Sequence, residues 1–277
     1  MTLIWTALIL LAALGAVFGW ILAFASKRLA VETDPRTQEI VAVLPGANCG
    51  ACGYPGCGGL AEAIVAGNAP VNACPVGKAP CAQKIGAIMG IEVDPSQKPQ
   101  FAHLLCHGGK AERVDRFYYM GVADCGAAQM MNGGYKMCEF GCLGLGNCAR
   151  ACKFDAIAIS ENELPVINRK RCTGCGACVQ ACPRGLIKLV DEDSRVMVIC
   201  KSHGKGPDVR KSCKVGCIGC GICAKNCPAQ AITLTDNLAA IDPEKCTACG
   251  ICVAKCPMKT IHFTDEADGK EVAQVTG

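Results

Sequence analysis

Apolar residues lie along this chain in one long run and in several short ones. The run Leu3–Ala25 contains no charged residue. As a helix rising about 1.5 Å per residue it would span roughly 34 Å, enough to cross a bilayer core of about 30 Å. Lys27 and Arg28 follow at once, so the positive-inside rule places the N-terminus outside the cell membrane and the rest of the chain in the cytoplasm. A cleaved signal peptide is the alternative, but it needs a basic start and a shorter apolar stretch.

One face of this predicted membrane helix carries small residues. Gly15 and Gly19 form a G-x-x-x-G pair, and Leu11 and Ala23 extend the same face. Small residues at this spacing let another helix approach closely, so the face predicts packing against a membrane partner. Chance is the alternative, because glycine is common in membrane helices.

Three shorter segments have the apolar spacing of helices. Asp34-Pro35 predicts a helix start, with Ile40, Val41 and Leu44 on one side of the helix. The two others are Gly58–Ala66 and Lys78–Met89.

Four cysteine-rich segments in the second half repeat one pattern. Three of them follow C-x2-C-x2-C-x3-C-P, over Cys172–Pro183, Cys217–Pro228 and Cys246–Pro257. A looser copy, Cys138–Cys152, has gaps of three, five and three residues and carries Lys153 where the others have proline. The apolar segments that follow the copies predict short strands at 156–157, 185–187, 231–232 and 260–261. In this bacterial ferredoxin signature, three cysteines bind one [4Fe-4S] cluster and the fourth binds the other cluster of a pair.

The composition favours metal over disulfide chemistry. Cysteine accounts for 25 of the 277 residues, whereas the chain has only 2 Trp, 4 Tyr and 7 Phe. Disulfide scaffolds are usually short and secreted, and an odd cysteine count does not suit one. Zinc is the rival metal, but its ribbon-like sites favour separated C-x2-C pairs. The net charge of +4 is too small and too dispersed to indicate nucleic acid binding.

Pairing consecutive copies predicts four clusters in two ferredoxin-like modules. The ligand sets predicted for the first module are Cys138, Cys142, Cys148 and Cys182, and Cys172, Cys175, Cys178 and Cys152. Those for the second module are Cys217, Cys220, Cys223 and Cys256, and Cys246, Cys249, Cys252 and Cys227. For the irregular first set, zinc or an empty site stays open. Nearer the N-terminus a fifth [4Fe-4S] cluster is predicted, among glycines that permit close backbone approach, at Cys49, Cys52, Cys57 and Cys74.

Five cysteines remain outside these sets. Cys106, Cys125, Cys200 and Cys213 either form a sixth cluster or are plain structural thiols, with a labile or regulatory thiol as a third alternative. The connection that carries the last two is long, and long loops usually have a function. Cys81, within a predicted helix, is expected to be a buried thiol.

No nucleotide-binding G-x-G-x-x-G or G-x4-G-K-[ST] motif and no flavin signature is present, so the chain is expected to relay electrons and holds no complete NAD site. The predicted fold is α+β, with one N-terminal transmembrane helix, a small helical four-iron domain and two bacterial-ferredoxin-like βαββαβ modules. The predicted divisions are anchor 1–26, linker 27–44, four-iron domain 45–100, connecting segment 101–137, first module 138–191, connecting loop 192–215, second module 216–264 and tail 265–277.

The order of these parts resembles one family over nearly the whole chain. Its most specific match is Pro45–Cys57, PGANCGACGYPGC, which resembles the B subunit of the Rnf complex, a membrane-bound, ion-translocating ferredoxin:NAD⁺ oxidoreductase. The chain looks like the longer form of that subunit, with two modules. The resemblance implies that it exchanges electrons with soluble ferredoxin and passes them to membrane partners. It further implies that other subunits carry flavins and the NAD site, and that the complex pumps Na⁺ or H⁺.

Two places on the chain are candidates for the ends of this relay. The Cys49 site, nearest the anchor in sequence, is the candidate exit. Lys225, Lys245, Lys255 and Lys259 surround the second module and could dock an acidic ferredoxin, an ordinary solvated surface being the alternative. Two rival functions stay open: a polyferredoxin feeding electrons to another membrane hydrogenase or dehydrogenase complex, and a cluster storage or scaffold protein.

Overall fold

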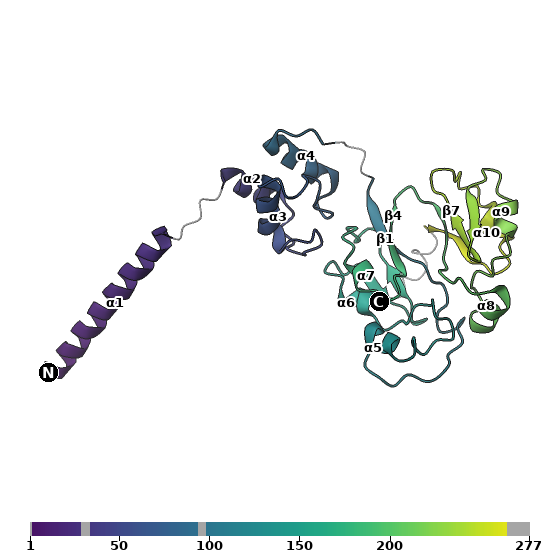
Figure 1. Ribbon diagram of the computed structural model, residues 1–277, viewed down its shortest axis with the longest axis horizontal. Coiled ribbons are helices and arrows are strands. Elements are labelled where there is room, and N and C mark those ends of the chain that lie inside the picture. Colours follow the sequence, from purple (N-terminus) through teal and green to yellow (C-terminus); the bar gives the residue numbers. More distant parts are fainter. Residues whose placement is uncertain (1, 29–33, 94–97, 265–277) are drawn as a thin grey trace.

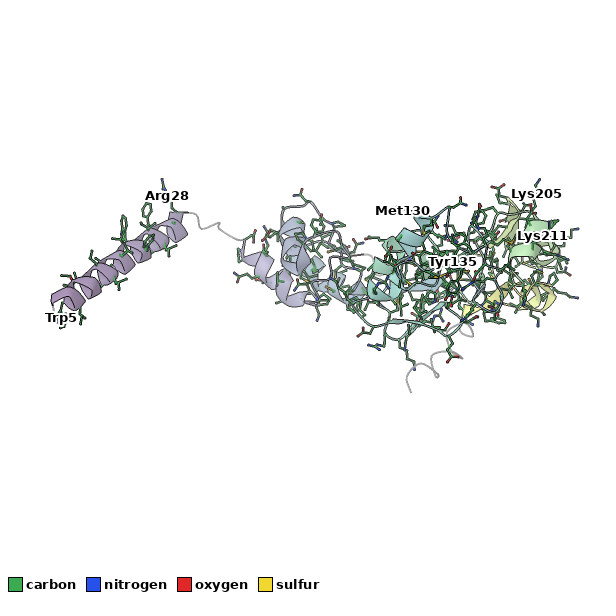
Figure 2. The ribbon with its side chains drawn as sticks, turned by 90° about the horizontal axis from the view of Figure 1, so that it is seen from below. Trp5, Arg28, Met130, Tyr135, Lys205 and Lys211 are labelled. Carbon is green, nitrogen blue, oxygen red and sulfur yellow. The ribbon has the colours of Figure 1, made fainter. Side chains whose placement is uncertain are left out.

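The computed structural model describes residues 2–28, 34–93 and 98–264. Helix α1 spans Thr2–Arg28, and its stretch Ile4–Ala25 is long and apolar enough to cross a membrane. Figure 1 shows α1 apart from the other elements, and large apolar side chains along it, such as Trp5, are exposed, as Figure 2 also shows. Gly15 and Gly19 have no other side chain or distant backbone within 4 Å of where a Cβ would lie, so the predicted packing face is open. The predicted tail 265–277 lies outside the described residues.

Three helices form a small apolar core around the first cysteine motif. They are α2 (Pro35–Val43), α3 (Gly56–Val65) and α4 (Lys78–Met89), as predicted from the apolar spacing. The Asp34 carboxylate caps α2 by accepting a hydrogen bond from the backbone N–H of Arg36 at 2.9 Å. Ile40 is fully buried in this core and Leu44 is 6% exposed, whereas Val41, at the edge of the same side, is 39% exposed. Successive residues of a helix point about 100° apart, which turns Val41 away from the core that Ile40 faces.

Residues 100–191 form the first ferredoxin-type unit, with two short helices between its first and second strands and one between its third and fourth. Strand β1 (Gln100–Leu104) pairs antiparallel with β4 (Ile187–Asp191), and β2 (Ile157–Ile159) pairs with β3 (Pro165–Ile167). Its short helices are α5 (Cys125–Met130), α6 (Asn147–Arg150) and α7 (Ala177–Gln180). The first and last strands of the unit thus lie together, with the cysteine motifs between them.

Residues 196–263 form the second ferredoxin-type unit with the same order. Strand β5 (Val196–Val198) pairs with β8 (Ile261–Phe263), and β6 (Ile232–Thr235) pairs with β7 (Leu238–Ile241). Its helices are α8 (Gly206–Ser212), α9 (Ile222–Lys225) and α10 (Ile251–Lys255). Each unit therefore begins earlier than the cysteine motifs indicate, because its first strand comes from a segment that the sequence presents only as a connection.

The two units are joined through these early segments. Arg113 of the first unit forms a β-bridge with Cys213 of the second. The N–H of Val114 donates to the carbonyl of Ser212 at 3.0 Å, and that of Lys214 donates to the carbonyl of Glu112 at 2.9 Å. The junction thus holds the end of α8 against the first unit, and Figure 1 shows the two units side by side.

Candidate iron–sulfur sites

All 25 cysteines are free thiols, and most gather in groups. Four groups bring together cysteines that the sequence assigns to one cluster. The Cys178 site consists of Cys152, Cys172, Cys175 and Cys178. The Cys223 site consists of Cys217, Cys220, Cys223 and Cys256, and the Cys252 site of Cys227, Cys246, Cys249 and Cys252. The Cys57 site contains Cys52, Cys57 and Cys74, with Cys49 on the same glycine-rich loop.

The sulfur atoms of these groups accept hydrogen bonds from the backbone. The fourth cysteine of each copy accepts from the N–H four residues later, as when Leu186 donates to Cys182 Sγ at 3.3 Å and Thr260 to Cys256 Sγ at 3.3 Å. Such donors stabilise thiolate sulfur and tune iron–sulfur clusters. The donor set and the backbone around it therefore fit [4Fe-4S] clusters.

Glycines make room for these groups at two tight turns of the chain. Gly174 (φ +72°) and Gly219 (φ +66°) each lie inside a C-x2-C turn, where the left-handed conformation favours glycine. A Cβ on Gly174 would lie 2.4 Å from the Gln100 carbonyl oxygen, and one on Gly219 would lie 2.8 Å from that of Asn237. The turns of the motif therefore pack directly on neighbouring backbone.

The irregular first copy departs from its predicted ligand set. One cavity is lined by Cys125, Cys142, Cys148 and Cys182, which we call the Cys142 site. Cys138, predicted for this set, lies instead at a second cavity. In the structure, Cys125 therefore takes the place that the predicted ligand set gave to Cys138.

The reason is a leucine in place of a cysteine. Counted from Cys142, the chain reads C-x2-L-x2-C-x3-C through Leu145, Cys148 and Cys152, which is the strict spacing with one ligand missing. Cys125, at the start of α5, packs against the same small apolar cluster as Leu145 and lines the cavity with Cys142 and Cys148, where the missing thiol would lie. The side-chain oxygen of Asn147 accepts a hydrogen bond from the Cys125 N–H at 2.9 Å, which fixes this approach. The sequence shows this missing cysteine when the four copies are aligned on their last two cysteines.

A sixth group lies at the junction of the two units. Cys106, Cys138, Cys200 and Cys213 line one cavity, which we call the Cys106 site. The predicted sixth set contained Cys125 where the structure has Cys138. The four thiols border a cavity, and no three His, Cys, Asp or Glu side chains in residues 2–28, 34–93 and 98–264 converge on a single metal ion.

Burial keeps many of these thiols neutral when no metal is bound. It raises the pKa of Cys142, Cys148 and Cys200 to about 12, and nearby cysteines add to the rise. Metal ligation needs the thiolate, so cluster assembly must release these protons. Cys81 is likewise buried, and burial raises its pKa to about 11. Its thiol lies 3.7 Å from the carbonyl oxygen of Val43, beside but outside the Cys57 site.

A buried cation, Lys136, and a partly buried one, Arg184, lie between the Cys142 and Cys106 sites. Lys136 is 1% exposed, and its ammonium donates to the carbonyl of Cys142. The Arg184 guanidinium donates to the carbonyl of Cys138 at 3.1 Å and to the Gln129 side chain at 2.7 Å. Burial lowers the pKa of both cations, while the cysteines nearby raise it. Neither has an ion pair with a carboxylate among the described residues, so an anionic group at these sites would provide the counter-charge.

The predicted docking residues lie on the second unit. Lys225, Lys245, Lys255 and Lys259 are all exposed, and Lys245 pairs with Asp242 at 3.5 Å. Cys220 and Cys249 are the two exposed cysteines of the 25. The clusters of this unit are therefore the ones with ligands at the surface.

A side-chain hydrogen bond links the four-iron domain to the first unit. The ammonium of Lys153 donates to the carbonyl of Cys49 at 3.2 Å. Lys153 follows Cys152 and stands where the other copies have proline. Lys153 thus connects the Cys178 site with the Cys57 site.

Cysteine sets of this kind on ferredoxin-type units define an iron–sulfur electron-transfer protein. Family models agree: an Fe-S cluster model matches residues 44–76, a 4Fe-4S binding domain residues 165–188 and a 4Fe-4S dicluster domain residues 216–260.

Relatives along most of the chain come from ion-translocating oxidoreductase complexes. The chain is 46% identical to the B subunit of the Na⁺-translocating ferredoxin:NAD⁺ oxidoreductase complex of Acetobacterium woodii, over 86% of this chain and 71% of that one. It is 46% identical to the B subunit of the ion-translocating oxidoreductase complex of Methanosarcina acetivorans, over 85% and 89%. It is 43% identical to the B subunit of the proton-translocating ferredoxin:NAD⁺ oxidoreductase complex of Clostridium ljungdahlii, over 86% and 84%. The chain therefore belongs to the B-subunit family of the Rnf complexes and is an electron-transfer subunit.

Proposed function

We propose that this chain takes electrons from soluble ferredoxin and passes them to membrane partners that reduce NAD⁺ and translocate Na⁺ or H⁺. The observation that carries the proposal is the grouping of thiols along the chain, from exposed sites on the second unit to the four-iron domain that follows α1. When bound, [4Fe-4S] clusters supply one-electron transfer. The residues that would hold five of them are those of the Cys57, Cys142, Cys178, Cys223 and Cys252 sites.

The second unit is the proposed docking surface for ferredoxin. The exposure of Cys220 and Cys249 supports this, because a partner can approach close to a cluster only where its ligands reach the surface. Apolar Ile222 and Ile251 lie beside them and are 37% and 38% exposed. Lys225, Lys255 and Lys259 surround this patch with positive charge, which attracts an acidic protein and speeds its association.

The four-iron domain is the proposed exit. The bond between Lys153 and Cys49 supports a path from the first unit, and α2 follows α1 closely in sequence. In this proposal α1 crosses the cell membrane once, with the N-terminus outside and the clusters in the cytoplasm, and its Gly15–Gly19 face packs on a membrane partner. Flavins and the NAD site belong to other subunits of the complex.

The test uses the purified complex with reduced ferredoxin and NAD⁺. We expect NADH formation, which slows when Lys225, Lys255 and Lys259 are all changed to Gln, most strongly at low salt. A matched control changes three exposed lysines elsewhere, Lys84, Lys110 and Lys170, and keeps the rate. A complex that forms no NADH, or clusters that leave the chain for an apoprotein acceptor, would favour the polyferredoxin or the scaffold function instead. Equal rates for both triple variants at low salt would move the docking surface elsewhere.

A further inference from the structure

We propose that Cys106, Cys138, Cys200 and Cys213 hold a sixth [4Fe-4S] cluster that connects the two ferredoxin-type units. The inference rests on the proposed electron-transfer function, since it adds a link to the same relay. None of the three family models covers Cys106, Cys138, Cys200 or Cys213.

The four thiols come together from separate parts of the chain. Cys106 follows β1, Cys138 begins the looser copy of the motif, Cys200 follows β5 and Cys213 follows α8. Cys106 is 9% exposed and Cys213 8%, so the site is enclosed. No disulfide joins them. Plain structural thiols need no common cavity, whereas four ligands of one cluster do.

The backbone leaves space for this site where a side chain would close it. A Cβ on Gly108 would lie 2.8 Å from the Sγ of Cys213. A Cβ on Gly216 would lie 2.5 Å from a methyl group of Val209, which also lines the cavity. Two glycines therefore keep the wall of the cavity back from its ligands.

Backbone donors point at the sulfur atoms. The N–H of Cys142 donates to Cys106 Sγ at 3.3 Å. The N–H groups of Ser202 and Cys217 both donate to Cys200 Sγ at 3.4 Å. These bonds match those at the fourth cysteine of each ferredoxin copy, and they favour negative charge on sulfur.

The charges around the site also call for an anionic occupant. The residues that line the cavity in the described chain include no aspartate or glutamate and two cations, Lys201 and Arg113, of which Arg113 already pairs with Asp115 and Glu163. Arg184 holds the carbonyl of Cys138, and the buried Lys136 lies next to the neighbouring Cys142 site. Four thiolates around a [4Fe-4S] core carry net negative charge, which offsets Lys201, Arg184 and Lys136, for which the described residues provide no carboxylate partner.

The Cys106 site lies between a cysteine site of the first unit and one of the second. Cys217 is a ligand of the Cys223 site in the second unit, and Cys142 is a ligand of the Cys142 site in the first. Each donates its N–H to a sulfur of the Cys106 site. The chemistry that a cluster here supplies is the gain of one electron from one neighbour and its loss to the other, with no bond made and no proton moved.

The test counts iron and acid-labile sulfide on the full-length chain purified without oxygen. Six cubanes require about 24 iron atoms per chain, and changing both Cys106 and Cys213 to Ala should leave about 20. The matched control, Cys81→Ala, removes a buried cysteine outside every site and should keep about 24. In the double variant, ferredoxin should still reduce the clusters of the second unit, while reduction of the first unit slows at least tenfold by freeze-quench electron paramagnetic resonance.

The wild-type count decides the question even if the double variant fails to fold. A wild-type chain with about 20 iron atoms overturns the sixth cluster and leaves the five-cluster function intact. A chain without stable clusters overturns the proposed function itself. An unchanged iron count in a folded double variant, or unimpeded transfer between the units, also overturns the inference.

Discussion

The exchange of Cys125 and Cys138 between sites can be tested by pairing substitutions. Each pair includes Cys142→Ala, because this residue belongs to the same cavity as Cys125 and to a different cavity from Cys138. Alanine removes the thiol but keeps the Cys142 N–H that donates to Cys106 Sγ. Two cysteines lost from one site cost one cluster, whereas two lost from different sites cost two.

The expected magnitudes follow by counting clusters. From about 24 iron atoms per chain, Cys125→Ala with Cys142→Ala should leave about 20, and Cys138→Ala with Cys142→Ala about 16. The assay is iron and sulfide per chain on protein purified without oxygen, with secondary structure checked by circular dichroism. The grouping predicted from the motif spacing gives the opposite order, about 20 for the Cys138 pair and about 16 for the Cys125 pair. That reversed order would refute the reasoning from the cavities.

A single rescue provides an independent check. Leu145 stands where the strict copies have their second cysteine, and Gly146 precedes α6 with a φ of +82°, as Gly176 precedes α7 with +77°. Leu145→Cys on the Cys125→Ala background recreates the strict C-x2-C-x2-C spacing. We expect it to recover the four iron atoms lost with Cys125, at about 24 per chain. No recovery would mean that the backbone at Leu145 does not place a ligand as in the other copies.

Three further predictions concern charge, protonation and metal. Lys136→Met removes a buried cation next to the Cys142 site. The reduction potential of a cluster at that site should therefore fall by roughly 60–130 mV, the equivalent of about 1.5–3 kcal/mol. A potentiometric titration that shows no fall, or a rise, contradicts the electrostatic role of Lys136. His103 is 3% exposed and burial, followed by the charge of Arg169, lowers its pKa to about 4. Between about pH 6.5 and 4 the histidine of the unfolded chain binds a proton and that of the folded chain does not. The free energy of unfolding should therefore fall as pH drops through this range, by up to about 1.4 kcal/mol per pH unit. Urea unfolding at pH 7 and 5 should show this loss in the wild type and a smaller loss in His103→Leu. Removing iron with a chelator should unfold both ferredoxin-type units, because the cysteines lie within their apolar cores, while α1 stays helical in detergent. Retention of the near-ultraviolet circular dichroism of the two units would argue that packing alone holds them.

Much of this protein is encoded locally and can be read from the sequence. The apolar run of α1, the Asp34-Pro35 helix start and the short strands after each motif all appear where their residues predict them. The strict C-x2-C-x2-C-x3-C-P copies bring together the cysteines expected of them. In each case the determining residues lie within one or two turns of one another, so spacing alone carries the information.

The remaining features depend on contacts between distant segments. The first strand of each unit pairs with its last across 63 residues or more, as Val198 does with Ile261, and no motif marks it. Cys125 and Cys138 are only 13 residues apart in the sequence, yet they line different cavities. Helix α5 places Cys125 at the Cys142 site. Cys138 lies at the Cys106 site, whose wall includes both residues of the β-bridge between Arg113 and Cys213. The sequence by itself determines that this is a chain of cysteine ligands behind a membrane helix. Which thiols share a cluster is decided by the tertiary structure, because a ligand set closes only where separate strands and turns pack together.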